Sequence, residues 1–471
     1  MHPIDYIILF GALFLLILTG WLSGKKWQND GSPKEFLMAG NGINKLQAGF
    51  SMAATDFGGS GLVGAIGYCY LVGLSGAWWN LAAAPAFILV GVLLARKFNG
   101  MGCATLPEFF GKRYGCSAKY ISCVLHILTN IASLAVQFTV SCTVLHVITG
   151  LNINVSLVIS VLIVLLLTSG GLRSVVNTDS FLFVIIVASI LLMVPFSIRA
   201  AGGYNTLVVS VPENFFRLDQ LGAWTPISWI LLCVLSYSTN QNYIQRMVSA
   251  KDEGTAVFGA IFTGGFYVVI SLALGLIDIA AHILLPGIED TNMIFPTMLV
   301  RFFPHGLLGL GLAAVFAATI STGTSILHAT ATLIINDIYV PLRKTKQSDR
   351  HVLIASRISV FAIALFSLGI SLFSSDIVNL CYVGGLFYGV SAFIPMIFGL
   401  HSKFVTGKAA FFSMVITVAL SLLWEYIPQM RGDVFAQIPS NVFGLVVSTV
   451  TICFLSLLTK KNHIRKGENH V

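Results

Sequence analysis

The sequence predicts an all-α integral membrane protein. Of its 471 residues, 56% are hydrophobic and only 10% are charged, whereas soluble domains carry about 25% charged residues. A membrane-spanning helix needs roughly 20 predominantly apolar residues, so the chain has room for about a dozen such helices and their loops. Composition therefore excludes an ordinary soluble domain.

We expect about thirteen transmembrane helices. The apolar segments are 4–24, 47–74, 77–95, 117–149, 152–170, 180–199, 225–247, 254–283, 305–336, 351–374, 376–400, 408–427 and 441–459. No long polar stretch separates them, which argues against a receptor or a sensor kinase. The motif GxxxxGK[ST] is absent, so we expect no ATP hydrolysis by this chain.

Charge placement predicts the topology. The first apolar segment lacks a basic region before it and is followed by Lys25 and Lys26, so we interpret it as a helix and not as a signal peptide. With the N-terminus outside and the C-terminus in the cytoplasm, 23 of the 27 Lys and Arg residues lie at the inner face, as the positive-inside rule requires. We expect a multi-pass protein of the plasma (inner) membrane. Topology accounts for the net charge of +8, so no nucleic acid partner is implied.

The eight cysteines are scattered and include no CxxC pair. They predict neither a disulfide framework nor a metal site of the zinc type. We interpret them as small apolar packing residues.

A cluster of hydroxyl groups interrupts the apolar segment 305–336. Ser321, Thr322, Thr324 and Ser325 fall within five residues. Hydroxyls in hydrocarbon cost free energy unless they have partners, and small neutral oxygens suit a hard, singly charged cation. The cluster therefore predicts an ion site inside the membrane.

The segment 47–74 has the composition of a broken helix. Six glycines lie between Gly49 and Gly67, together with Asp56, and each glycine costs about 1 kcal/mol in a helix relative to alanine. Close helix packing is one explanation of such glycines. The acid beside Gly58 and Gly59 favours the other, in which unwound backbone carbonyls line a cavity.

A second interruption is expected in 225–247, where residues 236–246 are polar for more than two helical turns. This polarity is explained by a face packed against neighbouring helices or, as we favour, by a substrate cavity and inner gate. Four spans separate the two interrupted spans, which is the spacing of two inverted five-helix halves, 47–199 and 225–400. Residues 1–46 then hold an extra helix and a cytoplasmic loop, and 401–471 hold two further helices and a tail.

Three motifs carry a resemblance to a known family. They are Asn240-Gln241-Asn242-Tyr243-Ile244-Gln245-Arg246, Gly170-Gly171-Leu172 followed by Thr178-Asp179, and Ala318 to Ser321-Thr322 leading to Asn336-Asp337-Ile338-Tyr339. In this order they resemble the sodium/solute symporter family, which includes sugar, proline and pantothenate carriers. The resemblance implies Na⁺ coupling, alternating access and a LeuT-type fold of two inverted five-helix repeats.

The resemblance also implies ion ligands. The principal sodium site would use the backbone carbonyls of Ala54, Phe57 and Ala318 and the hydroxyls of Ser321 and Thr322. A possible second sodium would lie among Asp179, Ser321, Thr324 and Ser325. Asp179 has an alternative explanation, because an acid at the start of a helix favours the helix dipole.

The solute and gate positions are expected at Asp56, Gly58, Ser60, Ser236, Tyr237, Asn240 and Tyr382. The carboxyl of Asp56 would support the cation site, face a substrate amine, or be protonated by burial. The span 254–283 has no lysine and residues 378–385 have no glutamine, unlike the sugar carriers. The proline and pantothenate carriers are more similar, which favours a small amino acid or an organic carboxylate.

The sequence therefore predicts a sodium-coupled symporter for a small organic solute, and not an enzyme. The alternatives are a sugar symporter, a symporter coupled to protons through Asp56, Asp179 or His328, and a transporter-like sensor that has lost coupling. The expected partners are the solute and the lipid bilayer. The sequence leaves the oligomeric state open, and we expect one chain to suffice for transport.

Overall fold

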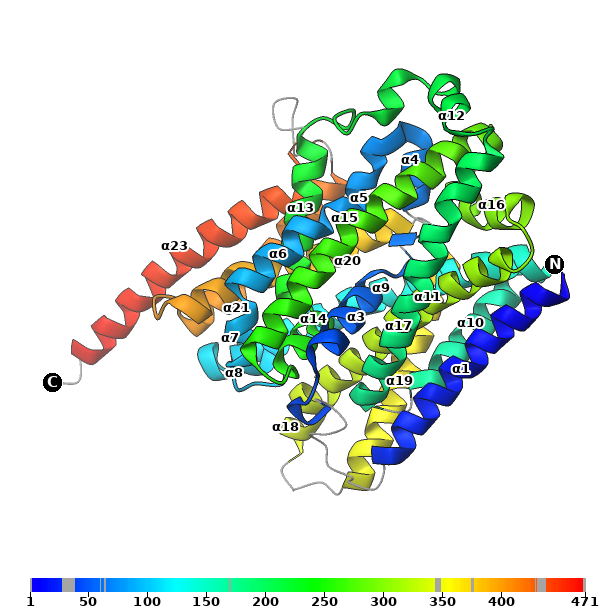
Figure 1. Ribbon diagram of the computed structural model, residues 1–471. Coiled ribbons are helices and arrows are strands. Elements are labelled where there is room, and N and C mark those ends of the chain that lie inside the picture. Colours follow the sequence, from blue (N-terminus) through cyan, green and yellow to red (C-terminus); the bar gives the residue numbers. More distant parts are fainter. Residues whose placement is uncertain are drawn as a thin grey trace.

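The computed structural model describes residues 2–27, 39–59, 61–62, 65–168, 171–343, 349–373, 377–427, 429 and 438–468. Within these residues the chain is almost entirely helical (Figure 1). The helices are α1 (Pro3–Trp27), α3 (Lys45–Asp56), α4 (Ala65–Val72), α5 (Trp78–Leu81), α6 (Ala83–Leu93), α7 (Ala95–Asn99), α8 (Leu106–Tyr114), α9 (Cys116–Thr149), α10 (Ile153–Leu167), α11 (Gly171–Ala200), α12 (Tyr204–Ser210), α13 (Trp224–Thr239), α14 (Gln241–Val248), α15 (Glu253–Leu284), α16 (Ile294–Phe302), α17 (Leu307–Leu333), α18 (Val340–Leu342), α19 (Asp349–Phe373), α20 (Ile377–His401), α21 (Gly407–Tyr426) and α23 (Ser440–Glu468).

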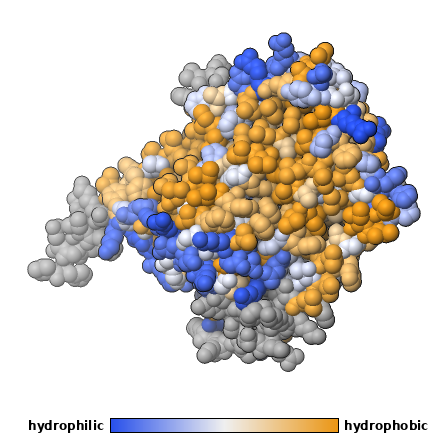
Figure 2. Space-filling view, viewed as in Figure 1, coloured by the Kyte–Doolittle hydropathy of each residue, from blue (hydrophilic) through white to orange (hydrophobic). Residues whose placement is uncertain are grey.

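The all-α membrane class is confirmed. In the described residues, nine helices are long and apolar enough to cross a membrane, and two shorter apolar helices cover Pro3–Leu16 and Ile153–Leu165. The expected number of thirteen spans stays a prediction. Figure 2 shows a broad hydrophobic belt between polar regions at the two ends of the molecule. Exposed apolar side chains in such a belt are those that face lipid.

Both interruptions predicted from the sequence are present. Helix α3 ends at Asp56 and α4 begins only at Ala65, while α13 ends at Thr239 and α14 begins at Gln241. The side chain of Asn240 caps α14 by accepting a hydrogen bond from the Asn242 amide, a common way to satisfy the first donors of a helix. Each break therefore leaves backbone N–H and C=O groups of helix termini inside the protein.

The helices form two groups. One contains α3, α4, α6, α13, α14 and α15, and the other contains α9, α10, α17 and α19. Helix α11 packs against α3 and α15 in the first group and α17 in the second, while α20 packs against α13 and α9. The most deeply buried membrane helix among the nine candidates is α17. Residues on α3 and α17 therefore lie where the two groups meet.

Helices outside the two halves lie at the periphery. Helix α1 packs on α11 and α17, and α21 and α23 pack on each other and on α20 (Figure 1). The carboxylate of Asp5 accepts hydrogen bonds from the Gly306 and Gly309 amides at 2.6 and 3.2 Å. It thereby caps the start of α17, where a negative charge is favourable. The exact limits of the halves, 47–199 and 225–400, stay a prediction.

Candidate ion and solute site

The break after α3 leaves helical hydrogen bonds unmade. The Gly58 amide donates to the carbonyl of Asp56 at 2.8 Å, and the Gly61 amide donates to that of Gly58 at 3.1 Å. In a continuous helix these two amides would bond to the carbonyls of Ala54 and Phe57. Those two carbonyls, which the resemblance assigns to sodium, therefore lack their helical donors.

Two other helices hold the break in place. The Gly59 amide donates to Oε1 of Gln137 on α9 at 2.8 Å. The hydroxyl of Thr322 on α17 donates to the carbonyl of Thr55 at 2.8 Å. A Cβ atom on Gly58 would lie 2.6 Å from Gln137 Oε1 and 2.7 Å from Thr322 Oγ1. Glycine at position 58 thus allows the close approach of α3 to α9 and α17.

The five residues predicted for the principal sodium site lie on α17 and on or just after α3. Ala54, Phe57 and Ala318 are fully buried, and Ser321 and Thr322 are nearly so. The hydroxyl of Ser321 donates to Asp179, while that of Thr322 reaches the end of α3 as described. Carbonyl and hydroxyl oxygens in a buried setting are suitable ligands for a hard cation. The arrangement supports the predicted site, which stays a prediction residue by residue.

Asp179 lies in a buried cluster that contains an arginine, and the sequence did not predict this ion pair. Its carboxylate accepts hydrogen bonds from Ser51 at 2.6 Å and Thr55 at 3.1 Å, both on α3. The guanidinium of Arg246 forms an ion pair with it at 2.8 Å, and both side chains are at most 1% exposed. Arg246 also donates to Ser51 and to Ser325, at 2.8 and 2.9 Å. We call Ser51, Asp179, Arg246, Ser321 and Ser325 the arginine cluster.

The arginine cluster joins α3, α11, α14 and α17. It brings together three of the four residues predicted for a second sodium, namely Asp179, Ser321 and Ser325. The fourth, Thr324, donates to the backbone carbonyl of Ser321 at 3.1 Å. The second sodium stays a prediction. Arg246 was predicted only as part of a motif, although an arginine inside a membrane protein is expected to pair with an acid.

A further set of contacts joins the residues that precede α3 to those that follow α14. Ile43 and Ala250 form an isolated β-bridge, in which the Ile43 amide donates to Ser249 at 3.3 Å and the Lys251 amide donates to Ile43 at 3.0 Å. Asn99 on α7 donates to the carbonyls of Met247 and Ala250. These contacts tie the start of α3 to the end of α14.

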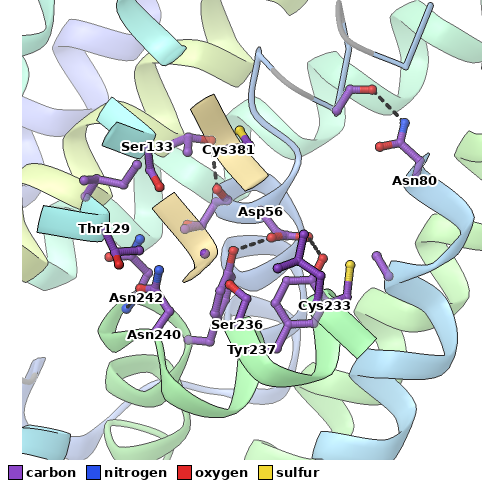
Figure 3. Close-up of a pocket in the computed structure, with 18 of the residues that line it drawn as sticks. Asp56, Asn80, Thr129, Ser133, Cys233, Ser236, Tyr237, Asn240, Asn242 and Cys381 are labelled. Atoms are coloured by element: carbon purple, nitrogen blue, oxygen red, sulfur yellow. Dashed lines mark hydrogen bonds between the residues drawn. The ribbon is translucent and has the colours of Figure 1, made fainter. Parts of the chain in front are cut away.

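A cavity of about 160 Å³ adjoins the two broken helices. Figure 3 shows its polar lining, with Asp56, Ser236 and Tyr237 close together and Thr129, Asn240 and Asn242 grouped beside them. Its wall also includes Thr55 and Thr322. The cavity therefore shares two residues with the contact between α3 and α17.

Asp56 is the charged group of this cavity. Its carboxylate accepts a hydrogen bond from the Tyr237 hydroxyl at 2.8 Å and another from the Tyr243 hydroxyl. Tyr267 lines the same wall. The ring of Phe87 stacks on that of Tyr237, with centroids 3.8 Å apart. We call Tyr237, Tyr243 and Tyr267 the tyrosine cage. The sequence predicted Tyr237 at the gate but missed the grouping, because the three residues come from α13, α14 and α15.

Four of the seven predicted solute and gate residues line the cavity, namely Asp56, Ser236, Tyr237 and Asn240. Gly58 lies beside it, at the break. Tyr382 does not line it, because its hydroxyl faces Asn441 on α23, at 3.4 Å from Oδ1. From the same helix, Cys381 and Gly385 line the cavity instead. Ser60 lies outside the described residues.

The chain is similar to known transporters over nearly its whole length. Residues 36–417 match the sodium:solute symporter family. Sodium/glucose cotransporter 1 of Oryctolagus cuniculus is 24% identical over 95% of this chain and 78% of its own. The osmoregulated proline transporter OpuE of Bacillus subtilis is 27% identical over 97% of this chain and 96% of its own.

Two solved structures share the fold. A substrate-bound, outward-open Na⁺-coupled sialic acid symporter superposes with a TM-score of 0.85 at 18% identity, covering 97% of this chain and 98% of that one. A nucleobase-cation-symport-1 family transporter in a closed conformation, with bromovinylhydantoin bound, gives 0.60 at 14% identity, covering 91% of this chain and 95% of that one. The LeuT-type fold predicted from the sequence is confirmed. The match over residues 36–417 shows that this chain belongs to the sodium:solute symporter family and is a transporter, not an enzyme, with Na⁺ as its coupling ion.

Proposed function

We propose that the protein imports a small organic solute together with sodium by alternating access, with an amino acid or an organic carboxylate as the favoured class. One observation carries this proposal. Thr55 and Thr322 contact each other where α3 meets α17, and both also line the cavity. An ion bound at that contact would therefore lie next to residues that also line the solute cavity.

These shared residues provide a physical basis for coupling. Sodium between α3 and α17 would hold the two helix groups together and fix the wall of the cavity. If sodium tightens solute binding, the solute must tighten sodium binding by the same factor. With the predicted topology, the arginine cluster and the Ile43–Ala250 bridge close the cytoplasmic side. Release of the ion would weaken the contact and let this side open.

The size and lining of the cavity support a small solute. Its volume of about 160 Å³ is close to the roughly 150 Å³ of an engineered cavity that admits benzene. The relative OpuE is named as a proline transporter, and other relatives are named as glucose cotransporters. A sugar is the alternative, but it needs several paired hydroxyl partners. Unlike the sugar carriers, the chain has no lysine in 254–283 and no glutamine in 378–385, and this favours the amino acid or carboxylate class.

Uptake by proteoliposomes tests the proposal. An inward sodium gradient should drive accumulation of a radiolabelled solute from a panel of amino acids, carboxylates and sugars. Replacing Ser321 and Thr322 together by alanine should raise the sodium concentration for half-maximal uptake at least about tenfold, equivalent to about 1.4 kcal/mol. The matched control replaces Ser413 and Thr417, two buried hydroxyls on α21, and should leave that concentration unchanged.

Two results would contradict the proposal. Uptake driven equally well by a proton gradient without sodium would remove the proposed coupling. If no panel member accumulates while the protein still binds solutes, a sensor that has lost coupling is the better interpretation.

A further inference from the structure

We propose that the transported solute carries a cationic nitrogen that binds Asp56, so that it is a zwitterion of the amino acid or betaine type and not a plain carboxylate or a sugar. This inference rests on the proposed function and narrows its solute class. It depends on three features of the cavity, namely its charge, its aromatic side chains and its neutral polar wall.

The described lining of the cavity contains one acidic side chain. Among the described residues that line it, Asp56 is the one charged side chain. Arg246 follows the lining residue Tyr243 by three positions, but its guanidinium is bound to Asp179. A plain carboxylate would bring a second negative charge close to Asp56, and like charges at short range are costly. A cationic nitrogen would instead neutralise the carboxylate.

Asp56 faces the cavity and not the predicted ion site. Its carboxylate is held by Tyr237 and Tyr243, which line the cavity with it. The neighbouring Thr55 also lines the cavity, but its hydroxyl donates to Asp179 in the arginine cluster. Successive residues of a helix point about 100° apart. Thr55 therefore contacts both the arginine cluster and the cavity, whereas the hydrogen bonds of the Asp56 carboxylate lie within the cavity lining, where a solute can reach it.

Aromatic side chains line the cavity together with this carboxylate. Tyr237, Tyr243, Tyr267, Trp79 and Trp229 all line the cavity. Aromatic faces attract cations, most strongly when water is excluded, and they recognise quaternary ammonium groups. A cavity whose lining combines one carboxylate with five aromatic rings is therefore suited to an ammonium group, including a methylated one.

Neutral donors lie on the remaining wall. The side chains of Thr129, Ser133, Gln137, Asn240 and Asn242 line the cavity, and Figure 3 shows Thr129, Asn240 and Asn242 grouped to one side of Asp56. Hydroxyl and amide groups can donate hydrogen bonds to a carboxylate. A zwitterion can thus place its nitrogen at Asp56 and its carboxylate at these donors, with no arginine required.

Pairs of probes that differ only in the charged nitrogen test the inference. L-proline is paired with cyclopentanecarboxylate, and glycine betaine with tert-butylacetate. Both pairs are measured within a panel of the standard amino acids and D-glucose. Thermal stabilisation of the full-length protein in detergent is recorded with and without sodium. We expect at least one nitrogen-containing probe to bind in sodium about tenfold or more tightly than its carbon isostere.

Variants connect that preference to Asp56. Asp56→Asn should abolish the preference and keep the stabilisation by sodium alone. Tyr243→Phe, which removes one hydroxyl from the cage, should weaken binding of the nitrogen-containing probe. Tyr204→Phe, at an exposed position on α12, is the matched control and should change nothing.

The contrary outcomes are distinct. If sodium stabilises the protein but carbon isosteres or glucose bind as tightly, or no nitrogen-containing probe binds, the inference is overturned and sodium coupling stands. If Asp56→Asn loses stabilisation by sodium, Asp56 belongs to the ion site and the inference is also overturned. If sodium does not stabilise the wild type, the proposed function fails and the inference fails with it.

Discussion

Arg246 is the largest fully buried side chain among the described residues. Its guanidinium donates to Asp179, to the hydroxyls of Ser51 and Ser325, and to the carbonyl of Asn242 at 2.8 Å. Taking two charges out of water is costly, and good geometry with further hydrogen bonds is needed to offset that cost. The ion pair is therefore stable only while both charges and the hydrogen bonds of the guanidinium are present.

Arg246→Gln should destabilise the protein strongly because it leaves the Asp179 carboxylate buried without its cation. The expected loss in the free energy of unfolding is about 3–5 kcal/mol, measured by thermal or denaturant unfolding in detergent. The double variant Asp179→Asn with Arg246→Gln should recover part of this loss. Arg217→Gln, at the exposed pair with Asp219, is the control and should have no measurable effect. A single variant as stable as wild type would contradict this account of the arginine cluster.

At the scale of elements, the break between α3 and α4 depends on how closely three helices approach. The amide of Gly59 and the carbonyl of Thr55 take partners from α9 and α17. Because Gly58 has no side chain, α3 can approach Gln137 and Thr322 this closely. Unwinding is thus stabilised by tertiary contacts that replace the lost helical hydrogen bonds.

Gly58→Ala should disturb the contact of α3 with α17, because its Cβ would lie under 3 Å from Gln137 Oε1 and Thr322 Oγ1. We expect the sodium concentration for half-maximal uptake to rise several-fold. Gly265→Ala on α15 is the matched control, since its Cβ would meet no atom within 4 Å. Equal sodium dependence of the two variants would show that the break does not shape the ion site.

The two helix breaks could be predicted because the local composition is enough to locate them. Glycines with an acid marked the break after Asp56, and a polar run marked the break at Asn240. The sequence could not predict partners that come from other helices. Gln137 at the break and Tyr267 in the tyrosine cage lie on α9 and α15, which carry several other polar residues, so the local sequence does not single these two out. Tyr382 was expected at the cavity, but a shift of one position along α20 places Cys381 there instead.

At the scale of the whole molecule, the predicted sodium site joins the two helix groups. Helix α3 belongs to one group and α17 to the other, and α11 packs against both. An ion between α3 and α17 changes the balance between conformations only by its difference in affinity for them. Sodium should therefore bind tightly to the arrangement seen here and weakly once α3 and α17 separate.

Equilibrium binding of radioactive sodium to the purified protein tests this central claim most directly. The account predicts saturable binding to wild type, retained when Ser413 and Thr417 are replaced by alanine. It predicts a large loss of binding when Ser321 and Thr322 are replaced by alanine, because two of the proposed ligands are then removed. Unchanged sodium binding to the Ser321 and Thr322 variant would contradict the account and place the ion elsewhere.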